Sequence, residues 1–164
     1  MTDQQQIILK MITGAWETQS SRVTKLVNSL TDEKLLTETA PGRNSGLYLV
    51  GHLAAVSDAL FPLMGWGEKL YPELDNIFLK NPEKSQFEKP SIAKIKECWT
   101  IIDLKVASHI KAMKFDEWFA KHSAVSAEDF AKEPFRNKMN ILINRTNHMS
   151  YHLGQMIYLT GKNE

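Results

Sequence analysis

The chain contains a single cysteine, Cys98, among its 164 residues, so no disulfide can form within it. Cys98 lies in a helical pattern beside Trp99 and Ile102. We interpret it as a small buried hydrophobe, with a reactive thiol as the alternative. A chain of this length can bury a hydrophobic core without disulfides or a structural metal. We therefore expect one domain that spans residues 1–164.

A surplus of charge of either sign is also absent. Lys and Arg total 20, Asp and Glu total 19, and the formal net charge is +1. A nucleic-acid-binding surface normally shows a strong basic excess, and an anionic membrane attracts a basic cluster. Neither is present, and no apolar run reaches the roughly 18 residues of a membrane span. Because the polar N-terminal residues also lack the features of a signal peptide, we expect a cytoplasmic protein that binds neither nucleic acid nor membrane.

The sequence has no glycine-rich phosphate loop, no Ser/His/Asp elbow motif, no low-complexity segment and no strand-like alternation. Apolar residues instead recur at helical spacing, which predicts an all-α protein. We predict helices over 4–30 and 32–38, from a cap at Asn44 or Ser45 to about Met64, from Ser91 to about Met113, over 115–121, and over about 135–160. A long connection spans 65–90. Four of these helices are long, and the compact arrangement for them is a four-helix bundle.

The helix that ends near Met64 is apolar almost all round, interrupted only by His52, Ser57 and Asp58. Such a helix must be covered on more than one side, and a second subunit is one source of that cover. Asp58 lies six residues after His52, roughly 600° around a helix, so its carboxylate faces away from that ring. We find no Asp or Glu placed as a general base.

Two histidines, His148 and His152, lie four residues apart in the last helix, on one face, with Cβ atoms about 5–6 Å apart. No Glu follows His148, so the H-E-x-x-H protease motif is absent. His52, on a different and strongly apolar helix, is the candidate third ligand, because metal sites in bundles are built from facing helices. Three neutral imidazoles and a water would form an open divalent-metal site. We expect His109 to be a core histidine and His122 to be solvated.

Residues one turn from these histidines are candidates to orient the rings. Asn144 and Gln155 lie one turn from His148 and His152, and metal-ligating imidazoles usually donate their second N–H to a carbonyl, carboxylate or amide. Tyr48 lies one turn before His52. The alternatives are a helix–helix hydrogen bond for Gln155 and a core aromatic for Tyr48.

The sequence around these histidines resembles a known family. Gly51-His52-Leu53-Ala54, followed by His148-x-x-Tyr151-His152-x-Gly154-Gln155, is similar to the DinB/YfiT-like superfamily over nearly the whole chain. Many members have Arg immediately before the glycine. This chain has Leu153 there, a departure that we expect to affect the surface rather than the metal.

The resemblance implies a four-helix bundle with a variant up-and-down topology, and a homodimer. It implies His52, His148 and His152 as ligands for a divalent ion, which is Zn, Ni, Mn or Fe among relatives. Characterised relatives include metal-dependent transferases and isomerases that use low-molecular-weight thiols, and hydrolases.

Two interpretations of function stay open. One is a metal-dependent thiol transferase or hydrolase that acts on a small molecule. The other is a non-catalytic dimer that binds a metal or a stress-related small molecule, and a member whose site has lapsed is a third possibility. The fourth coordination position distinguishes the first two, because an open position favours an enzyme and a side chain such as His109 favours storage. The sequence does not identify the substrate.

Overall fold

The computed structural model describes residues 2–161 and is all-helical, with no strand in that range. In chain order the elements are α1 (Asp3–Ser29), α2 (Asp32–Leu36), α3 (Gly46–Asp58), α4 (Leu60–Met64), α5 (Leu74–Phe78), α6 (Ile92–Ala112), η1 (Phe115–Phe119), α7 (Ala127–Lys132), α8 (Lys138–Met156) and η2 (Ile157–Thr160). The all-α prediction is confirmed.

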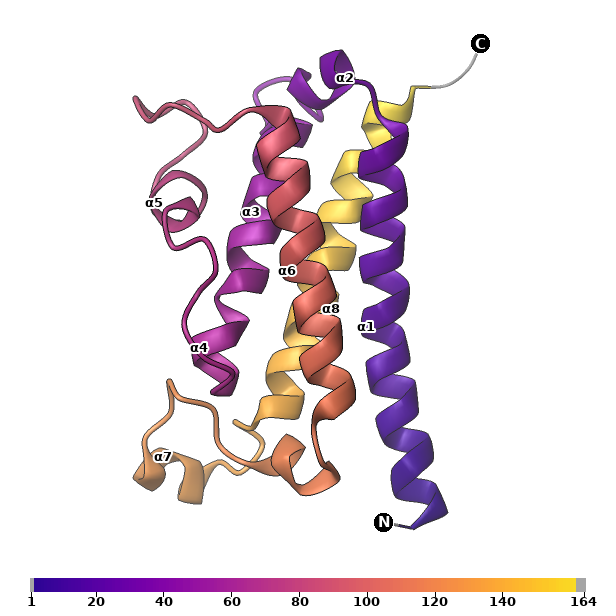
Figure 1. Ribbon diagram of the computed structural model, residues 1–164, viewed down its shortest axis with the longest axis vertical. Helices are drawn as coiled ribbons and strands as arrows, with labels where there is room; N and C mark the ends of the chain where they lie inside the picture. The colour runs from indigo at the N-terminus through magenta and orange to yellow at the C-terminus, as the bar shows by residue number, and fades with distance from the viewer. Residues whose placement is uncertain (1, 162–164) are drawn as a thin grey trace.

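The long helices α1, α3, α6 and α8 lie side by side around one hydrophobic core (Figure 1). Helix α1 packs mainly on α8, and α3 packs mainly on α6, while α3 also contacts α8 and α1 contacts α6. Core residues come from all four of these helices. Cys98 is fully buried in this core, which confirms its interpretation as a small hydrophobe.

Helix α3 is the most enclosed element, since every one of its residues except His52 is buried. Helices α5, α6 and α8 all pack against it. The chain itself therefore covers the apolar surface of this helix, a cover that a second subunit was also expected to be able to provide. The segment Gly46–Met64 does have the length and hydropathy of a membrane span, which the sequence interpretation missed. Because 72% of its 18-residue apolar window is buried inside the protein, it has the character of a core helix.

The predicted helix to Met64 is interrupted at Ala59, where α3 ends and α4 begins one residue later. Pro62 explains the interruption, because proline has no N–H to donate to the carbonyl of Asp58 and its ring clashes with that carbonyl. The Asp58 side chain is fully buried and accepts hydrogen bonds from the backbone N–H groups of Leu70 and Tyr71. The end of α3 is thereby tied to the connection that leads to α5.

The last long helix begins later than predicted, at Lys138 rather than near residue 135. Asn137 caps it, since its side-chain oxygen accepts the backbone N–H of Asn140. Pro134 lies before the cap, outside the helix. The helix also ends at Met156, and a 3₁₀ turn, η2, continues to Thr160.

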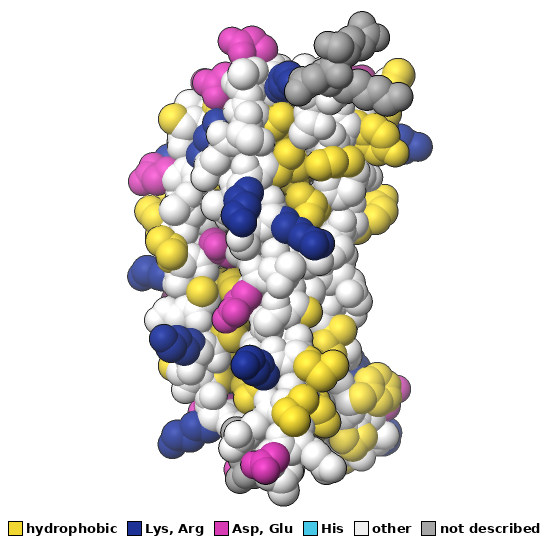
Figure 2. All heavy atoms as spheres, turned by 90° about the vertical axis from the view of Figure 1, so that its right-hand side faces the viewer, with side chains coloured by type: hydrophobic (Ala, Val, Ile, Leu, Met, Phe, Trp, Pro, Cys, Tyr) yellow, Lys and Arg dark blue, Asp and Glu magenta, His cyan; other side chains and the backbone are white. Residues whose placement is uncertain are grey.

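One side of the molecule exposes a row of apolar side chains along α1 and α8, here called the α1–α8 face. Figure 2 views the protein from the side of α1 and shows hydrophobic side chains at several levels of this surface, interspersed with Lys and Arg. Its large exposed hydrophobic residues are Ile7, Ile8 and Met11 on α1, Ile143 on α8, and Ile157 at the start of η2. A largely apolar groove of about 540 Å³ runs between the two helices, and Leu153 is one of its lining residues. Leu153 is half-buried and packs against the core, and it lines this groove rather than the pocket beside His152.

Candidate metal centre

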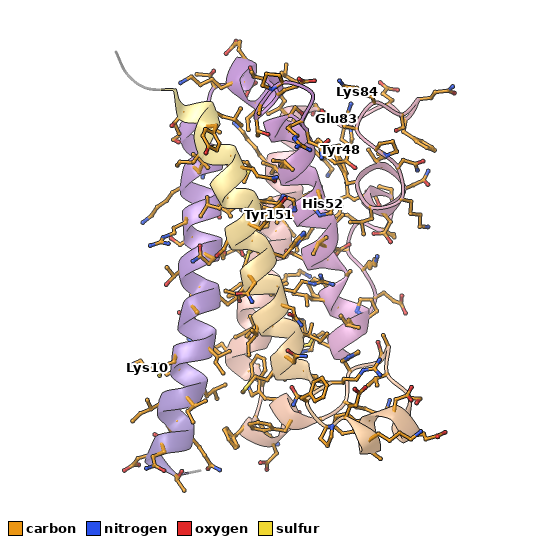
Figure 3. All side chains as sticks on the ribbon, turned by 180° about the vertical axis from the view of Figure 1, so that it is seen from behind. Lys10, Tyr48, His52, Glu83, Lys84 and Tyr151 are labelled. Carbon is orange, nitrogen blue, oxygen red and sulfur yellow. The ribbon has the colours of Figure 1, made fainter. Side chains whose placement is uncertain are left out.

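The three predicted ligands come together between α3 and α8. His52 projects from the middle of α3, and His148 and His152 project from successive turns of α8. One ring nitrogen from each lies within 4.8 Å of the others. Figure 3 shows His52 on α3 beside α8, close to the level of Tyr151. The sequence interpretation therefore identified a real spatial cluster from residues 96 positions apart.

In two of the three rings, the nitrogen that faces away from the cluster, Nδ1, is hydrogen-bonded to another part of the protein. His52 Nδ1 lies 2.8 Å from the backbone carbonyl oxygen of Phe78, and His152 Nδ1 lies 2.7 Å from the side-chain oxygen of Gln155. A carbonyl oxygen only accepts, so both rings carry a proton on Nδ1 and present a bare lone pair at Nε2. The fold thus fixes the tautomer in which Nε2 is ready to bind a cation.

The three Nε2 atoms converge. His148 Nε2 lies 3.2 Å from His52 Nε2 and 2.9 Å from His152 Nε2. Two nitrogens bound to one tetrahedral Zn²⁺ at about 2.0 Å would lie roughly 3.3 Å apart, so the spacing fits a shared ion. Because the Nε2 lone pairs face one another, a cation between them would also offset their mutual repulsion. The donor set of imidazoles suits a divalent transition metal.

The electrostatics favour the neutral form of His148 and His152. Burial, and then the His152 and His52 rings and Arg145, lower the pKa of His148 from 6.5 to about 4. Burial also lowers the pKa of His152, while its hydrogen bond to Gln155 opposes the shift. Metal ligation requires an unprotonated nitrogen, so both rings are ready to bind near neutral pH.

No fourth His, Cys, Asp or Glu joins the cluster among residues 2–161. His109 instead stacks on the ring of Trp66, with ring centroids 5.0 Å apart, and meets Phe61 edge-on. It is half-buried, so the prediction of a core histidine holds only in part: the ring packs on aromatic residues and also lines a pocket. The prediction for His122 is wrong: the residue is buried, and its Nδ1 accepts the backbone N–H of Ala124, so its own loop supplies the polar partner that solvent was expected to supply.

A pocket of about 290 Å³ lies beside the cluster and includes His152 in its wall. The segment before α3, α3 itself and α8 all contribute to it, and its lining residues are Thr39, Gly42, Arg43, Asn44, Leu49, Tyr151, His152 and Gln155. Most of these side chains are polar. The pocket offers space for a small molecule next to His152.

The orienting residues were only partly predicted. Gln155 does hold His152. Asn144 does not hold His148, because its amide reaches back to the side chain of Asn140. Tyr48 is a core aromatic whose hydroxyl donates to the carbonyl oxygen of Asn81. The carbonyl of Phe78 was missed, and no side-chain pattern could reveal it, since a backbone group in a distant segment supplies the contact.

The fold and the site define a class: an all-helical protein in which three imidazoles from two helices converge beside a pocket. The chain belongs to the DinB superfamily, whose profile matches residues 15–156. This match includes all three histidines and confirms the resemblance found in the sequence. No curated protein matches the chain.

Proposed function

We propose that the protein is a divalent-metal-dependent enzyme of the DinB type, which binds its ion through His52, His148 and His152. The observation that carries this proposal is the convergence of the three Nε2 atoms, with two Nδ1 atoms already hydrogen-bonded by the protein. Zn, Ni, Mn and Fe all suit the imidazole donors.

The reaction that we propose is group transfer to or from a small thiol, or hydrolysis of a small molecule. A divalent ion with three neutral ligands supplies Lewis acidity, which lowers the pKa of water or a thiol toward neutrality. The protein's own part is to hold the ligand rings in one tautomer and to place a substrate in the pocket that His152 lines. No carboxylate belongs to the cluster within residues 2–161, so we assign no protein base.

The first test is the metal content of the native protein. We expect about one divalent transition-metal ion per chain and its loss in His148→Ala. His109→Ala is the matched control, because His109 contacts aromatic rings outside the cluster and its removal leaves the ligands in place. A native protein without bound metal, or a His148→Ala variant that takes up metal like the control, would contradict the proposal.

The alternative is a non-catalytic protein that binds a metal or a small molecule. It uses the same three histidines, but it predicts a filled fourth position. The absence of a fourth side-chain ligand among the described residues, together with the adjoining pocket, favours the enzyme. Turnover of the host's low-molecular-weight thiols by the metal-loaded protein distinguishes the two, because a binding protein retains such molecules unchanged.

We further propose that the four long helices form the up-and-down variant bundle of the family, and that two chains pair through the α1–α8 face. The exposed apolar side chains and the apolar groove on this face support the pairing. Isolated exposed hydrophobic residues are common on monomers, whereas several on one face together with an apolar groove favour an interaction site. The pocket beside His152 involves α3 and α8, and the lining of the groove includes no histidine.

A further inference from the structure

The pocket beside the cluster shares a residue with the candidate metal centre. His152 is a candidate ligand through Nε2, and it also forms part of the pocket wall. Gln155, which accepts from Nδ1 of the same ring, lines the pocket as well. A molecule in the pocket therefore lies against the metal centre. At about 290 Å³ the pocket is close to the lower end of the usual range for ligand sites, so it suits a small molecule or one end of a larger one.

The wall of this pocket carries charge of one sign. Arg43 is its one permanently charged side chain, and no Asp or Glu belongs to the lining. Arg43 is exposed and forms none of the salt bridges found within residues 2–161. The acidic residue nearest to it in the sequence, Glu38, accepts the backbone N–H of Gly42 and pairs with Lys84 instead. The fold therefore leaves the positive charge of Arg43 to the pocket and the solvent.

The neutral polar groups of the wall can act as hydrogen-bond donors. Tyr151 carries a hydroxyl group and Asn44 a side-chain amide, and both line the pocket. Gln155 turns its side-chain oxygen toward His152, so the NH₂ branch of its amide is the part that remains for a ligand. Donors grouped around a single guanidinium are complementary to a group that has both acceptor oxygens and negative charge.

A tight turn holds Arg43 at the pocket. The backbone N–H of Arg43 donates to the carbonyl oxygen of Ala40, 2.9 Å away, across a Pro-Gly pair. Gly42 has φ +73°, as the third residue of a type II turn requires. Thr39 joins the ends of the turn, because its backbone N–H and its hydroxyl both donate to the carbonyl oxygen of Asn44. The backbone at Arg43 is thus ordered before a ligand arrives, which lowers the entropy cost of binding.

The metal would reinforce the charge of Arg43. A divalent ion on three neutral imidazoles keeps its full positive charge, and no Asp or Glu belongs to the histidine cluster within the described residues. An ammonium group in the pocket would be repelled by both cations, and an anion would be attracted by both. Carboxylates and phosphates fit best, since a guanidinium binds either with two parallel hydrogen bonds.

We propose that the pocket beside His152 binds an oxyanion group, a carboxylate or a phosphate, of the small-molecule substrate, and that Arg43 selects this group. The inference rests on the proposed metal function, because the reacting end of the same molecule lies at the three histidines. It specifies the substrate as a small molecule with an anionic end and makes Arg43 a specificity-determining residue.

The test uses the full chain with Co²⁺ as the probe metal and four small thiols as probe ligands. Mercaptopropionate carries a carboxylate, mercaptoethylphosphonate a phosphonate and cysteamine an ammonium group, while mercaptopropionamide is the neutral reference. Sulfur-to-cobalt charge-transfer absorption gives the affinity for each thiol at constant ionic strength. We expect at least one anionic thiol to bind about tenfold more tightly than the amide, and cysteamine to bind most weakly. The anionic thiol that is preferred identifies the group as a carboxylate or a phosphate.

Variants then locate the effect. In Arg43→Gln we expect Co²⁺ to bind as in the native chain and the preference for the anionic thiol over the amide to fall about tenfold. Arg43→Lys keeps the charge without the planar fork and should retain part of the preference. Arg22→Gln is the matched control, because Arg22 is an exposed arginine that lines the groove between α1 and α8. Comparing the ratio of the two affinities cancels the difference between the sulfur atoms of the probes.

Two results overturn the inference. One is a native chain that binds the anionic thiols no better than the amide. The other is a preference that survives unchanged in Arg43→Gln, because the anion would then be bound by the metal or by another residue. In either case Co²⁺ binding itself leaves the proposed metal function standing.

A measurement without metal separates the two proposals in the other direction. The NMR signal of the Arg43 Nε–H group is followed while metal-free protein is titrated with the same thiols. If Co²⁺ does not bind, the proposed metal function fails, and a shift caused by the anionic thiols but not by the amide still supports an anion site at Arg43. If neither Co²⁺ nor an anionic thiol binds, both proposals fail.

Discussion

His52 donates its Nδ1–H to the backbone carbonyl oxygen of Phe78, 2.8 Å away, and the ring of that same Phe78 lies over Gly51. An ideal Cβ on Gly51 would come within 2.4 Å of the Phe78 ring, which is fully buried. One residue of α5 therefore sets both the packing of α3 and the tautomer of a candidate ligand.

This contact predicts the effect of Gly51→Ala. The added methyl group forces the buried ring away, and we expect a loss of about 1–3 kcal/mol in the free energy of unfolding, as for other overpacked cores. Because the carbonyl of Phe78 moves with the ring, metal affinity should fall as well. Chemical denaturation and metal titration measure the two effects.

The control for that variant is Gly14→Ala in α1, where no atom lies within 4 Å of an added Cβ. Alanine has the higher helix propensity, so we expect Gly14→Ala to leave stability unchanged or to raise it by up to about 1 kcal/mol. Equal stability of the two variants would show that Phe78 is free to move, contrary to the structure.

The hydrogen bond from His152 to Gln155 should contribute to metal affinity. In Gln155→Leu the ring loses its acceptor, and we expect metal to bind about 10–100-fold more weakly. Gln155→Glu keeps an acceptor at this position and should bind metal at least as well as the native chain. Competition with a chelator measures both affinities, and an unchanged affinity in Gln155→Leu would show that the side chain does not orient the ring.

The stability of the metal-free protein should depend on pH through His148. Its pKa is about 4 in the folded protein and 6.5 when unperturbed, so between these values the unfolded chain binds a proton that the folded chain does not. The free energy of unfolding therefore falls as the pH is lowered through this window, and the contribution of this group is constant below pH 4. The full shift corresponds to about 3.4 kcal/mol, and solvent screening of the half-buried ring reduces the expected loss to about 2 kcal/mol.

The matched experiment for this pH effect compares the native chain with His148→Gln, both with a chelator present. Urea denaturation at several pH values isolates the contribution of the ring, because the other groups titrate in both proteins. A native chain whose stability falls no more steeply than that of His148→Gln would show that the ring is solvated and that its pKa is ordinary.

The proposed dimer predicts the outcome of a charge placed on the α1–α8 face. Met11, 68% exposed, lies in this face, and Met11→Glu should convert a dimer into monomers without unfolding them. Leu104→Glu is the control, since Leu104 is 65% exposed on α6, outside the face. Sedimentation equilibrium gives the mass of each species. If Met11→Glu and Leu104→Glu have the same mass as the native chain, pairing does not use this face.

The sequence predicted the all-helical fold and the histidine cluster for physical reasons. Helical periodicity is a local property, and His148 and His152 share one face by spacing alone. His52 could be added because a polar ring on an otherwise apolar helix requires a partner, and it is the one residue of α3 that is not buried. The helix boundaries were less accurate, since Pro62 and the Asn137 cap act at single residues inside otherwise continuous patterns.

Other parts of the site depend on tertiary structure and were not predictable. The acceptor for His52 is a backbone carbonyl, which carries no residue-specific signal. The burial of Arg145 Nε and His148 Nδ1 without a partner within residues 2–161 appears only once every neighbouring helix is in place. The cytoplasmic location, the single-domain organisation and the lack of nucleic-acid or membrane partners stay predictions.

The ligands on α3 and α8 also have a consequence for the dynamics of the protein. His52 and His148 are separated by 96 positions, so an ion shared between them would close a long loop and act as a removable cross-link between two central helices. Its departure would remove this link and leave the two helices held by their packing alone. Amide hydrogen exchange in α3 and α8 should slow on metal loading, while the exposed first turns of α1 remain as fast as before.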